Sequence, residues 1–506
     1  MKKLLLFLAL AAGAFTASAS GLNVFASELT SPTANKVAFV LNDDANVVLN
    51  LIKDGTVVKN IEIGPCQKGA NEFEIPDVYE NGEFQWSLTA SAEPVTEATL
   101  VQSCLTNTTL QIANTRSVAI DNNPESKFFG HIYVTSIAAN GMSGARLGTG
   151  IYVLNAALED FANQGDTPYA GGVSWSGKSS PMRVAVAEDG NVFISDWSDG
   201  HSGVWKMNPE DPSVMTEVFG GTRDSDGLAS VDGVNVHGSV VDLCLVGKGA
   251  DLKLYTADED MPNVVNRYDL GESTDLWVTA PSATWSNPAG FANRTDCIES
   301  DRNGGIWLVQ NRWRNSTANP SLFHLNTSGE WDYIVADQNI LLGSTPFAAL
   351  CVSPDGKSLA VACEGYTYVY DVEFTDGTPA ITAKYTLDSP ESVRPFHCDF
   401  DAAGNLYVAY NDKNGGVCQY SLPKAENKFD TPAPSFVTLT NQTGIFETAV
   451  EGRIRYAGGV VSAPAGAEIF NALGAKVAEG TEISTESLAA GVYIVRSGKQ
   501  ALKIVR

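Results

Sequence analysis

Short apolar runs alternate with polar turns throughout the middle of the chain, from about residue 116 to residue 440. A turn glycine followed by a strand-like apolar run recurs six times, and successive glycines are 48 to 60 residues apart. These glycines are Gly130, Gly190, Gly249, Gly304, Gly356 and Gly404. A period near 50 residues with several short strands per repeat is typical of a β-propeller. One such sheet cannot bury both of its faces alone, so the repeats are expected to stack around an axis.

Each repeat predicts four strands, which in the second repeat cover residues 184–186, 192–194, 203–207 and 216–219. Asp189-Gly190 and Asp355-Gly356 predict tight hairpins, because glycine readily adopts positive φ. Six repeats are evident. A seventh, assembled from residues 100–114 and the segment after Phe436, remains an alternative. The expected range of the propeller is 105–440.

Both flanks of the repeats also predict strands. Residues 28–98 hold short apolar runs joined by polar turns, with a hairpin at Asp54-Gly55, and predict a separate β-sandwich. A proline-containing linker at residues 431–434 precedes a small predicted β-sandwich over 445–506. The expected fold class is therefore all-β, with a six-bladed or alternatively seven-bladed propeller between two β-sandwiches.

The first residues have the features of a signal peptide over 1–19. Lys2 and Lys3 precede an apolar stretch at 4–15, and Ala17-Ser18-Ala19 supplies small residues for cleavage. No other apolar run approaches the ~20 residues of a membrane-spanning helix, so no span is predicted.

Two segments near the end of the chain bear on where the protein is located. Residues 467–477 read AEIFNALGAKV and residues 489–496 read AAGVYIVR. Their sequence and spacing resemble the C-terminal sorting domain of the type IX secretion system of Bacteroidetes. The resemblance implies that the secretion machinery is a partner, that a surface protease removes the domain, and that the protein is secreted or attached to the outer membrane at the cell surface.

The N-terminal sandwich has a resemblance of its own. The run VVLNLIKDGTVVKNIEIG at residues 47–64, with the strands that follow, is similar to the immunoglobulin-like domain of flagellar hook-capping proteins. Ile75-Pro76-Asp77 replaces the tryptophan-aspartate turn of that family. The resemblance implies that the sandwich at 28–98 is immunoglobulin-like and serves as a spacer on a surface protein, and it implies no functional residue.

The net charge and the cysteine positions limit the classes of binding partner and the disulfides that are expected. The net charge of −26 and the pI near 4.5 oppose binding to phosphate backbones and anionic lipid, so no nucleic acid partner is expected. Of the eight cysteines, Cys244, Cys297, Cys351 and Cys398 occupy matching strands of successive repeats and are interpreted as small buried hydrophobes. Cys66 and Cys104 lie outside that pattern and are the candidates for a disulfide.

Propeller geometry predicts where a ligand binds. The first strand of each blade crosses from one face to the other and the second returns, so the starts of first strands and the ends of second strands meet at one mouth. The predicted ligand-binding residues near that mouth are Arg116, Arg183, Asp196, Asp242, Asp296, Asn311, His397, Trp175, Trp197 and Trp285. Carboxylates and amides beside aromatic rings suit a glycan. The competing interpretation is that each residue only bonds loop backbone or packs between blades.

Catalytic motifs such as G-x-S-x-G, the P-loop and H-E-x-x-H are absent from the sequence, and no catalytic residue or metal ligand is assigned. Acidic loops at 224–227 and 258–260 leave calcium open as a cofactor but lack the full calcium-loop pattern. We expect binding of a glycan, peptide or host-surface ligand, and expect no cofactor. The alternatives are a calcium-dependent lactonase-like hydrolase or polysaccharide lyase, and a structural surface scaffold.

Overall fold

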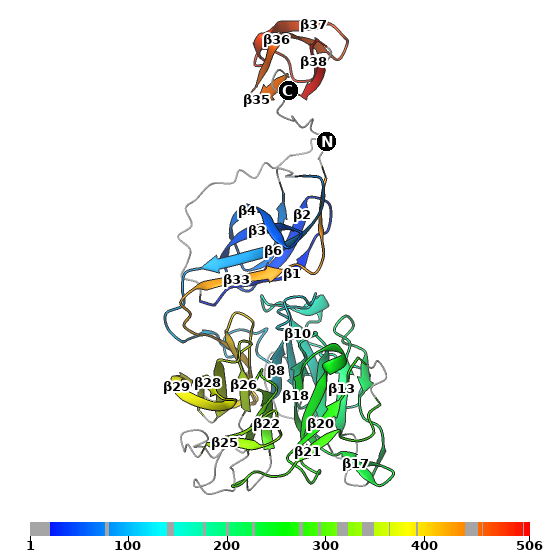
Figure 1. Ribbon diagram of the computed structural model, residues 1–506, viewed down its shortest axis with the longest axis vertical. Helices are drawn as coiled ribbons and strands as arrows, with labels where there is room; N and C mark the ends of the chain where they lie inside the picture. The colour runs from blue at the N-terminus through cyan, green and yellow to red at the C-terminus, as the bar shows by residue number, and fades with distance from the viewer. Residues whose placement is uncertain are drawn as a thin grey trace. The chain divides into compact units, whose positions relative to one another are not determined.

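The computed structural model describes most of the chain, and its regular secondary structure consists almost entirely of β-strands (Figure 1). The described residues are 21–505 without 76–79, 139–145, 176–178, 199–201, 225–227, 273–276, 292–294, 311–321, 336–348, 364, 391–392, 441–453, 458 and 499. The predicted signal peptide lies outside them. The helical segments described are two short 3-10 turns, η1 (Phe161–Asn163) and η2 (Gly249–Asp251). Within this part of the chain, no helix has the length and apolarity needed to cross a membrane.

Six antiparallel sheets follow one another through the predicted propeller range, each ordered as a meander from its first strand outward. The first three contain β8 (Thr115–Ile120), β9 (Ile132–Ser136) and β10 (Gly150–Leu154); β11 (Val184–Val186), β12 (Val192–Asp196), β13 (Gly203–Met207) and β14 (Met215–Glu217); and β18 (Val240–Val246), β19 (Lys253–Asp258), β20 (Val265–Asp269) and β21 (Ala283–Trp285).

The other three sheets have four strands each. They contain β22 (Thr295–Ser300), β23 (Ile306–Gln310), β24 (Leu322–Leu325) and β25 (Trp331–Val335); β26 (Ala349–Val352), β27 (Ser358–Cys363), β28 (Tyr366–Thr375) and β29 (Thr378–Asp388); and β30 (Pro395–Phe400), β31 (Leu406–Tyr410), β32 (Gly416–Ser421) and β7 (Thr99–Gln102).

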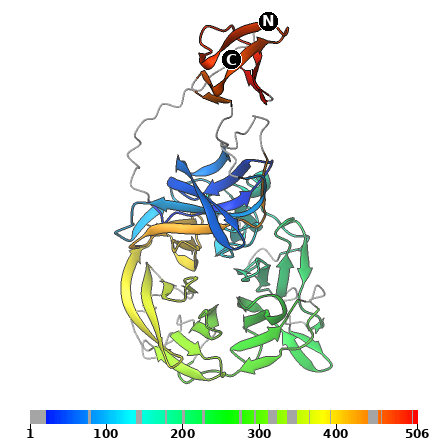
Figure 2. The ribbon, with the colours of Figure 1, turned by 45° about the horizontal axis from the view of Figure 1, so that its top comes forward.

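The first strands of these sheets close into a ring, which confirms the predicted propeller. In chain order they are β8, β11, β18, β22, β26 and β30; each contacts the next, and β30 contacts β8. Figure 2 shows the sheets arranged around this axis. The second strands β9, β12, β23 and β31 are buried at every residue, since each lies between two strands of its own sheet and two neighbouring sheets.

The last sheet is completed by a strand from the other end of the propeller. β7 precedes the first repeat in sequence, yet pairs with β32, so the ring is held together by hydrogen bonds between its two ends. Residues 100–114, considered above as part of a seventh repeat, thus begin in the outer strand of the sixth sheet. A further small sheet of β15 (Thr222–Arg223), β16 (Ala229–Val231) and β17 (Val234–His237) is inserted between β14 and β18 and was not predicted.

The N-terminal region forms two sheets, but its boundary differs from the prediction. One sheet contains β1 (Ala26–Thr30), β2 (Lys36–Leu41) and β5 (Gly69–Glu74); the other contains β3 (Ala45–Lys53), β4 (Thr56–Cys66), β6 (Gly82–Ala92) and β33 (Asn427–Pro432), and β34 (Val437–Leu439) also pairs with β6. Residues 427–432 were assigned to the propeller. They belong to the N-terminal sheets because the whole length of β33 pairs with β6, so the propeller is an insertion between strands of one sheet.

Most residues from 438 onward form a second compact unit. Its strands are β35 (Arg455–Ala457), β36 (Val460–Asn471), β37 (Lys476–Ser484), β38 (Val492–Ser497) and β39 (Gln500–Val505). They are joined in one hydrogen-bonded sheet, because the long β36 pairs with β37 and with both β35 and β38. The apolar residues Val461, Ile469 and Val495 are buried in its core.

Candidate functional site at the propeller axis

Six residues, five in first strands and Arg183 directly before β11, share one register position around the axis. Each lies opposite the penultimate residue of the second strand of its sheet, as in the pairs Ser117–Thr135 and His397–Ala409. We call this set the axial layer: Ser117, Arg183, Asp242, Cys297, Ala349 and His397. Because the first strands form a closed ring, these six residues lie at one height along the axis.

A bulge precedes the axial layer in four of the six sheets. The register shifts by one residue in β8, β18, β22 and β30, which leaves Arg116, Val241, Asp296 and Phe396 as the extra residues. A bulge re-aims the side chains around it. Arg116 and Asp296 therefore occupy bulge positions, whereas Arg183, Asp242 and His397 belong to the axial layer.

The axial layer contains an ion pair that is almost completely shielded from solvent. Arg183 and Asp242 are 0% and 1% exposed, and the Nε of Arg183 lies 3.8 Å from a carboxylate oxygen of Asp242. Asp242 also accepts backbone N–H bonds from Leu243 (2.9 Å) and Ile298 (2.8 Å). Burial raises the pKa of Asp242, while Arg183 and these donors act in the opposite direction.

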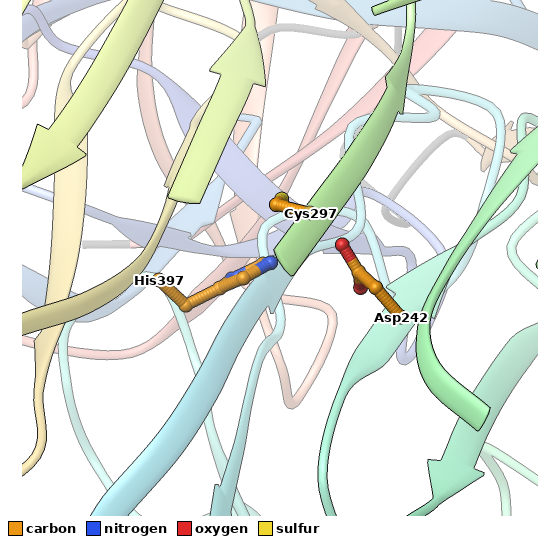
Figure 3. Close-up of side chains that lie close together, drawn as sticks. All are labelled: Asp242, Cys297 and His397. Atoms are coloured by element: carbon orange, nitrogen blue, oxygen red, sulfur yellow. The ribbon is translucent and has the colours of Figure 1, made fainter. Parts of the chain in front are cut away.

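His397 is oriented by a neighbouring sheet. Its Nδ1 lies 3.0 Å from the carbonyl oxygen of Val118 and 3.2 Å from the hydroxyl of Ser117. Burial and the nearby charge of Arg183 hold the pKa of His397 well below its ordinary value, so the ring is neutral at pH 7. Figure 3 shows the His397 ring and the Asp242 carboxylate approaching each other from opposite sides, with Cys297 beside them.

An arginine pair lies at the start of the first strands. The guanidinium groups of Arg116 and Arg183 lie 5.1 and 4.8 Å from the ring centre of Phe396, and Arg183 donates to the carbonyl oxygens of Arg116 and Phe396. Burial, together with the charges of Arg183 and Arg394, lowers the pKa of Arg116 to about 10. Phe396 packs in an apolar cluster with Met182, Val241 and the partly buried Trp197.

A cavity of about 410 Å³ lies at the other end of the first strands. It is lined by residues two positions beyond the axial layer, notably Glu299 and Asp399, and by the turns that follow the first strands, including Asn122, Lys248 and Arg302. His397 also lines it. The expected mouth was at the starts of the first strands, so this cavity opens among the opposite set of turns. Parts of the connections at the predicted mouth lie outside the described residues.

The cavity combines carboxylates with a guanidinium group. Arg302 lies 3.2 Å from Glu299 and donates to the carbonyl oxygen of Val352 at 3.0 Å. Asp399 accepts the backbone N–H groups of Ile120 and Phe400, each at 2.8 Å. Burial and repulsion by Glu299 raise the pKa of Asp399 to about 7. The site thus offers several fixed hydrogen-bond acceptors beside a paired cation.

The other predicted site residues have structural partners. Asp196 accepts hydrogen bonds from Ser180 and Ser198 at the end of β12, and Asp296 is buried in its bulge. Asp258 in the acidic loop at 258–260 accepts three backbone N–H groups, which is ordinary turn chemistry. Asn311 lies outside the described residues.

The three tryptophans do not line the cavity. Trp175 donates to the carbonyl oxygen of Ala170, and Trp197 donates to the carboxylate of Glu259 at 2.6 Å. Trp285 ends the outer strand β21 and stacks on Tyr255, with a ring-centre distance of 6.0 Å. For Trp175 and Trp285 the structure favours the packing interpretation.

Sequence reasoning missed five residues that the structure brings to the axis: Ser117, Cys297, Glu299, Arg302 and Asp399. A usable signal was the aspartate that follows the first strand in three repeats, at Asp121, Asp301 and Asp401, where it accepts turn N–H groups. Counting four residues back from each reaches Ser117, Cys297 and His397. The repeats were aligned on their turn glycines, which left the positions within each first strand uncertain by one or two residues. This common register was therefore not recognised.

No protein-family model and no curated protein matches this chain. Solved structures with similarity include a glucose dehydrogenase (14% identity, covering 63% of this chain and 98% of that chain, TM-score 0.39). They also include the soluble aldose sugar dehydrogenase of Escherichia coli (13%, 65% and 100%, TM-score 0.37). An auxiliary nutrient binding protein of Bacteroides ovatus matches at 10% identity over 79% of this chain and 98% of that chain, with a TM-score of 0.40. Likeness at this level says nothing about ligand or activity.

Proposed function

We propose that this chain is an exported, six-bladed propeller protein that binds a hydroxyl-rich small molecule, such as one unit of a glycan, in the axial cavity. The observation that carries the proposal is the meeting of Glu299, Arg302 and Asp399 in one cavity at the axis. Carboxylate oxygens accept hydrogen bonds from sugar hydroxyls, and a guanidinium group donates to sugar oxygens. The volume of about 410 Å³ lies within the range of small-molecule sites.

The binding interpretation is preferred to the calcium-dependent hydrolase for a chemical reason. That alternative places carboxylate and amide side chains around a central calcium ion, with Asp242, Asp296, Asn311, Glu364 and Asn411 as the candidates. Asp242 instead lies beside Arg183, Cys297 and His397, and this mixed donor set differs from the all-oxygen ligands that calcium selects.

Substitution of the cavity residues is expected to weaken ligand binding at least tenfold. A glycan array identifies a binding saccharide, and calorimetry then compares wild-type protein with Glu299→Gln and Arg302→Ala. Each substitution removes a charged partner of the ligand and breaks the Glu299–Arg302 ion pair, and a tenfold loss corresponds to about 1.4 kcal/mol.

The matched control is Arg267→Ala, since Arg267 pairs with Asp269 on the outer part of another sheet. Equal affinity of all variants, with unchanged melting temperatures, would place the ligand elsewhere, and a failure to bind any saccharide would contradict the ligand class.

The export proposal rests on the two termini and is tested separately. A reporter carrying residues 1–27 at its start and 441–506 at its end is expected to reach the medium or the surface of a bacterium with type IX secretion. The same reporter without 441–506 should stay in the periplasm, because it lacks the segment that resembles the sorting domain. Surface delivery of both reporters would show that the C-terminal segment is not the sorting signal.

A further inference from the structure

We propose that Asp242, Cys297 and His397 form a binding site for a divalent transition metal ion, with Zn²⁺ as the best match. The three side chains belong to the axial layer and come from β18, β22 and β30 (Figure 3). One ligand atom from each lies within 4.8 Å of the others, and all three residues are buried. The inference does not depend on the ligand proposed for the cavity.

The closure of the propeller explains why residues so distant in sequence converge. Asp242 and Cys297 lie on neighbouring first strands, β18 and β22, which contact each other. His397 lies on β30, and Ala349 occupies the axial layer on β26 between them.

The histidine has the orientation of a metal ligand. With a proton on Nδ1, which lies 3.0 Å from the carbonyl oxygen of Val118, the ring keeps its lone pair on Nε2. Metal-binding histidines commonly donate their other ring nitrogen to a backbone carbonyl or carboxylate, which fixes both tautomer and ring angle. Asp242 is held in a similar way, since each of its carboxylate oxygens accepts one backbone N–H group.

The chemistry of the three side-chain ligands indicates which metal ion fits the site. One thiolate, one imidazole and one carboxylate suit Zn²⁺ and other first-row transition ions, whereas calcium and magnesium prefer oxygen ligands alone. Binding exchanges the thiol proton of Cys297 for the metal, and the proton is released to solvent. The resulting charges are +2 from the metal and −1 each from Cys297 and Asp242, with Arg183 as an adjacent cation.

The site borders the axial cavity at one ligand. His397 lines that cavity, whereas Asp242 and Cys297 are not among its lining residues. Three protein ligands leave one position of a tetrahedral zinc ion open, which is the arrangement of sites where zinc holds water or a ligand.

The test uses full-length mature protein, because the three ligands come together only in the closed ring. Protein is unfolded with chelator, refolded with one equivalent of Co²⁺ or Zn²⁺ and dialysed. Wild-type protein should retain about one equivalent of metal, and the cobalt form should show a thiolate-to-cobalt charge-transfer band. Cys297→Ser should abolish this band, and His397→Gln should lower zinc affinity at least tenfold.

The matched control is Cys244→Ser, which removes another buried cysteine of the first strands, two positions after Asp242. Its metal content and cobalt spectrum should equal those of wild type. X-ray absorption of the wild-type zinc form should show one sulfur neighbour, and this measurement requires no variant to fold. Wild-type protein without stoichiometric metal, a zinc shell without sulfur, or a charge-transfer band that persists in Cys297→Ser overturns the proposal.

Discussion

Oxidation is expected to stabilise this protein by about 2–4 kcal/mol, because it joins Cys104 to Cys418 across the closure of the propeller. The two sulfur atoms lie 3.4 Å apart although the residues are 314 positions apart in sequence. The backbone N–H of Cys104 also donates to the sulfur of Cys418 at 3.2 Å. The bond would tie the segment after β7 to β32, so that the ring could not open between its first and last strands.

The electrostatics favour Cys418 as the attacking thiolate. The side-chain hydrogen bond between the two thiols and then the backbone N–H of Cys104 lower the pKa of Cys418, while the pKa of Cys104 is raised. In the reaction the two thiols lose two protons and two electrons, which a disulfide oxidant such as oxidised glutathione accepts. The sequence left open whether Cys66 pairs with Cys104; in the structure Cys104 instead contacts Cys418, while Cys66 lies on β4.

The measurement is denaturant unfolding of oxidised and reduced protein, with the linkage located by peptide mapping without reduction. The difference in unfolding free energy should disappear in Cys104→Ser and in Cys418→Ser. Cys66→Ser is the control and should keep it. If the oxidised wild-type protein yields no Cys104–Cys418 peptide, the expected bond does not form.

Asn427→Ala is expected to lower the free energy of unfolding by roughly 3–5 kcal/mol, because one buried amide satisfies three backbone groups. Its Oδ1 accepts the N–H of Val24 at 2.7 Å. Its Nδ2 donates to the carbonyl oxygens of Leu22 and Glu93 at 2.9 and 3.0 Å. The residue is 3% exposed, so water does not replace these bonds without rearrangement.

The same substitution should loosen the first described residues. Asn405 of the sixth sheet accepts the N–H of Asn23 and donates to its carbonyl oxygen, both at 2.8 Å, so residues 22–25 connect the sandwich to the propeller. Limited proteolysis should cut Asn427→Ala in this segment sooner than wild type. Asn60→Ala, at an exposed position of β4, is the matched control. Equal unfolding free energies for the two variants would show that the Asn427 hydrogen bonds add little.

Most individual strands of the propeller were predictable from local pattern. The first-to-third strands of the second repeat were expected at 184–186, 192–194 and 203–207 and occur as β11, β12 and β13. The hairpin glycines Gly190 and Gly356 have φ values of 80° and 73°, as the turn chemistry required. β33 was assigned to the wrong domain because the sequence of a short strand does not indicate which sheet the strand joins.

The candidate site was predictable only in part. Arg183, Asp242 and His397 were named, and they do meet at the axis. Cys297 was interpreted as a buried hydrophobe, because its strand reads like the other apolar first strands. The bulge before the axial layer adds one residue in some sheets, and sequence spacing cannot show whether Arg116 or Ser117 faces the other blades.

The amino-acid sequence by itself determined the repeat, the strands and their turns, since these follow from the order of apolar, polar and glycine residues over a few positions. It also carries the features of the two termini on which the export proposal rests. Only the tertiary structure decided that Asp242, Cys297 and His397 converge, that Cys104 contacts Cys418, and that the cavity opens beside Glu299 and Asp399. Those contacts depend on which distant strands become neighbours when the ring closes, and on register shifts that no local pattern specifies.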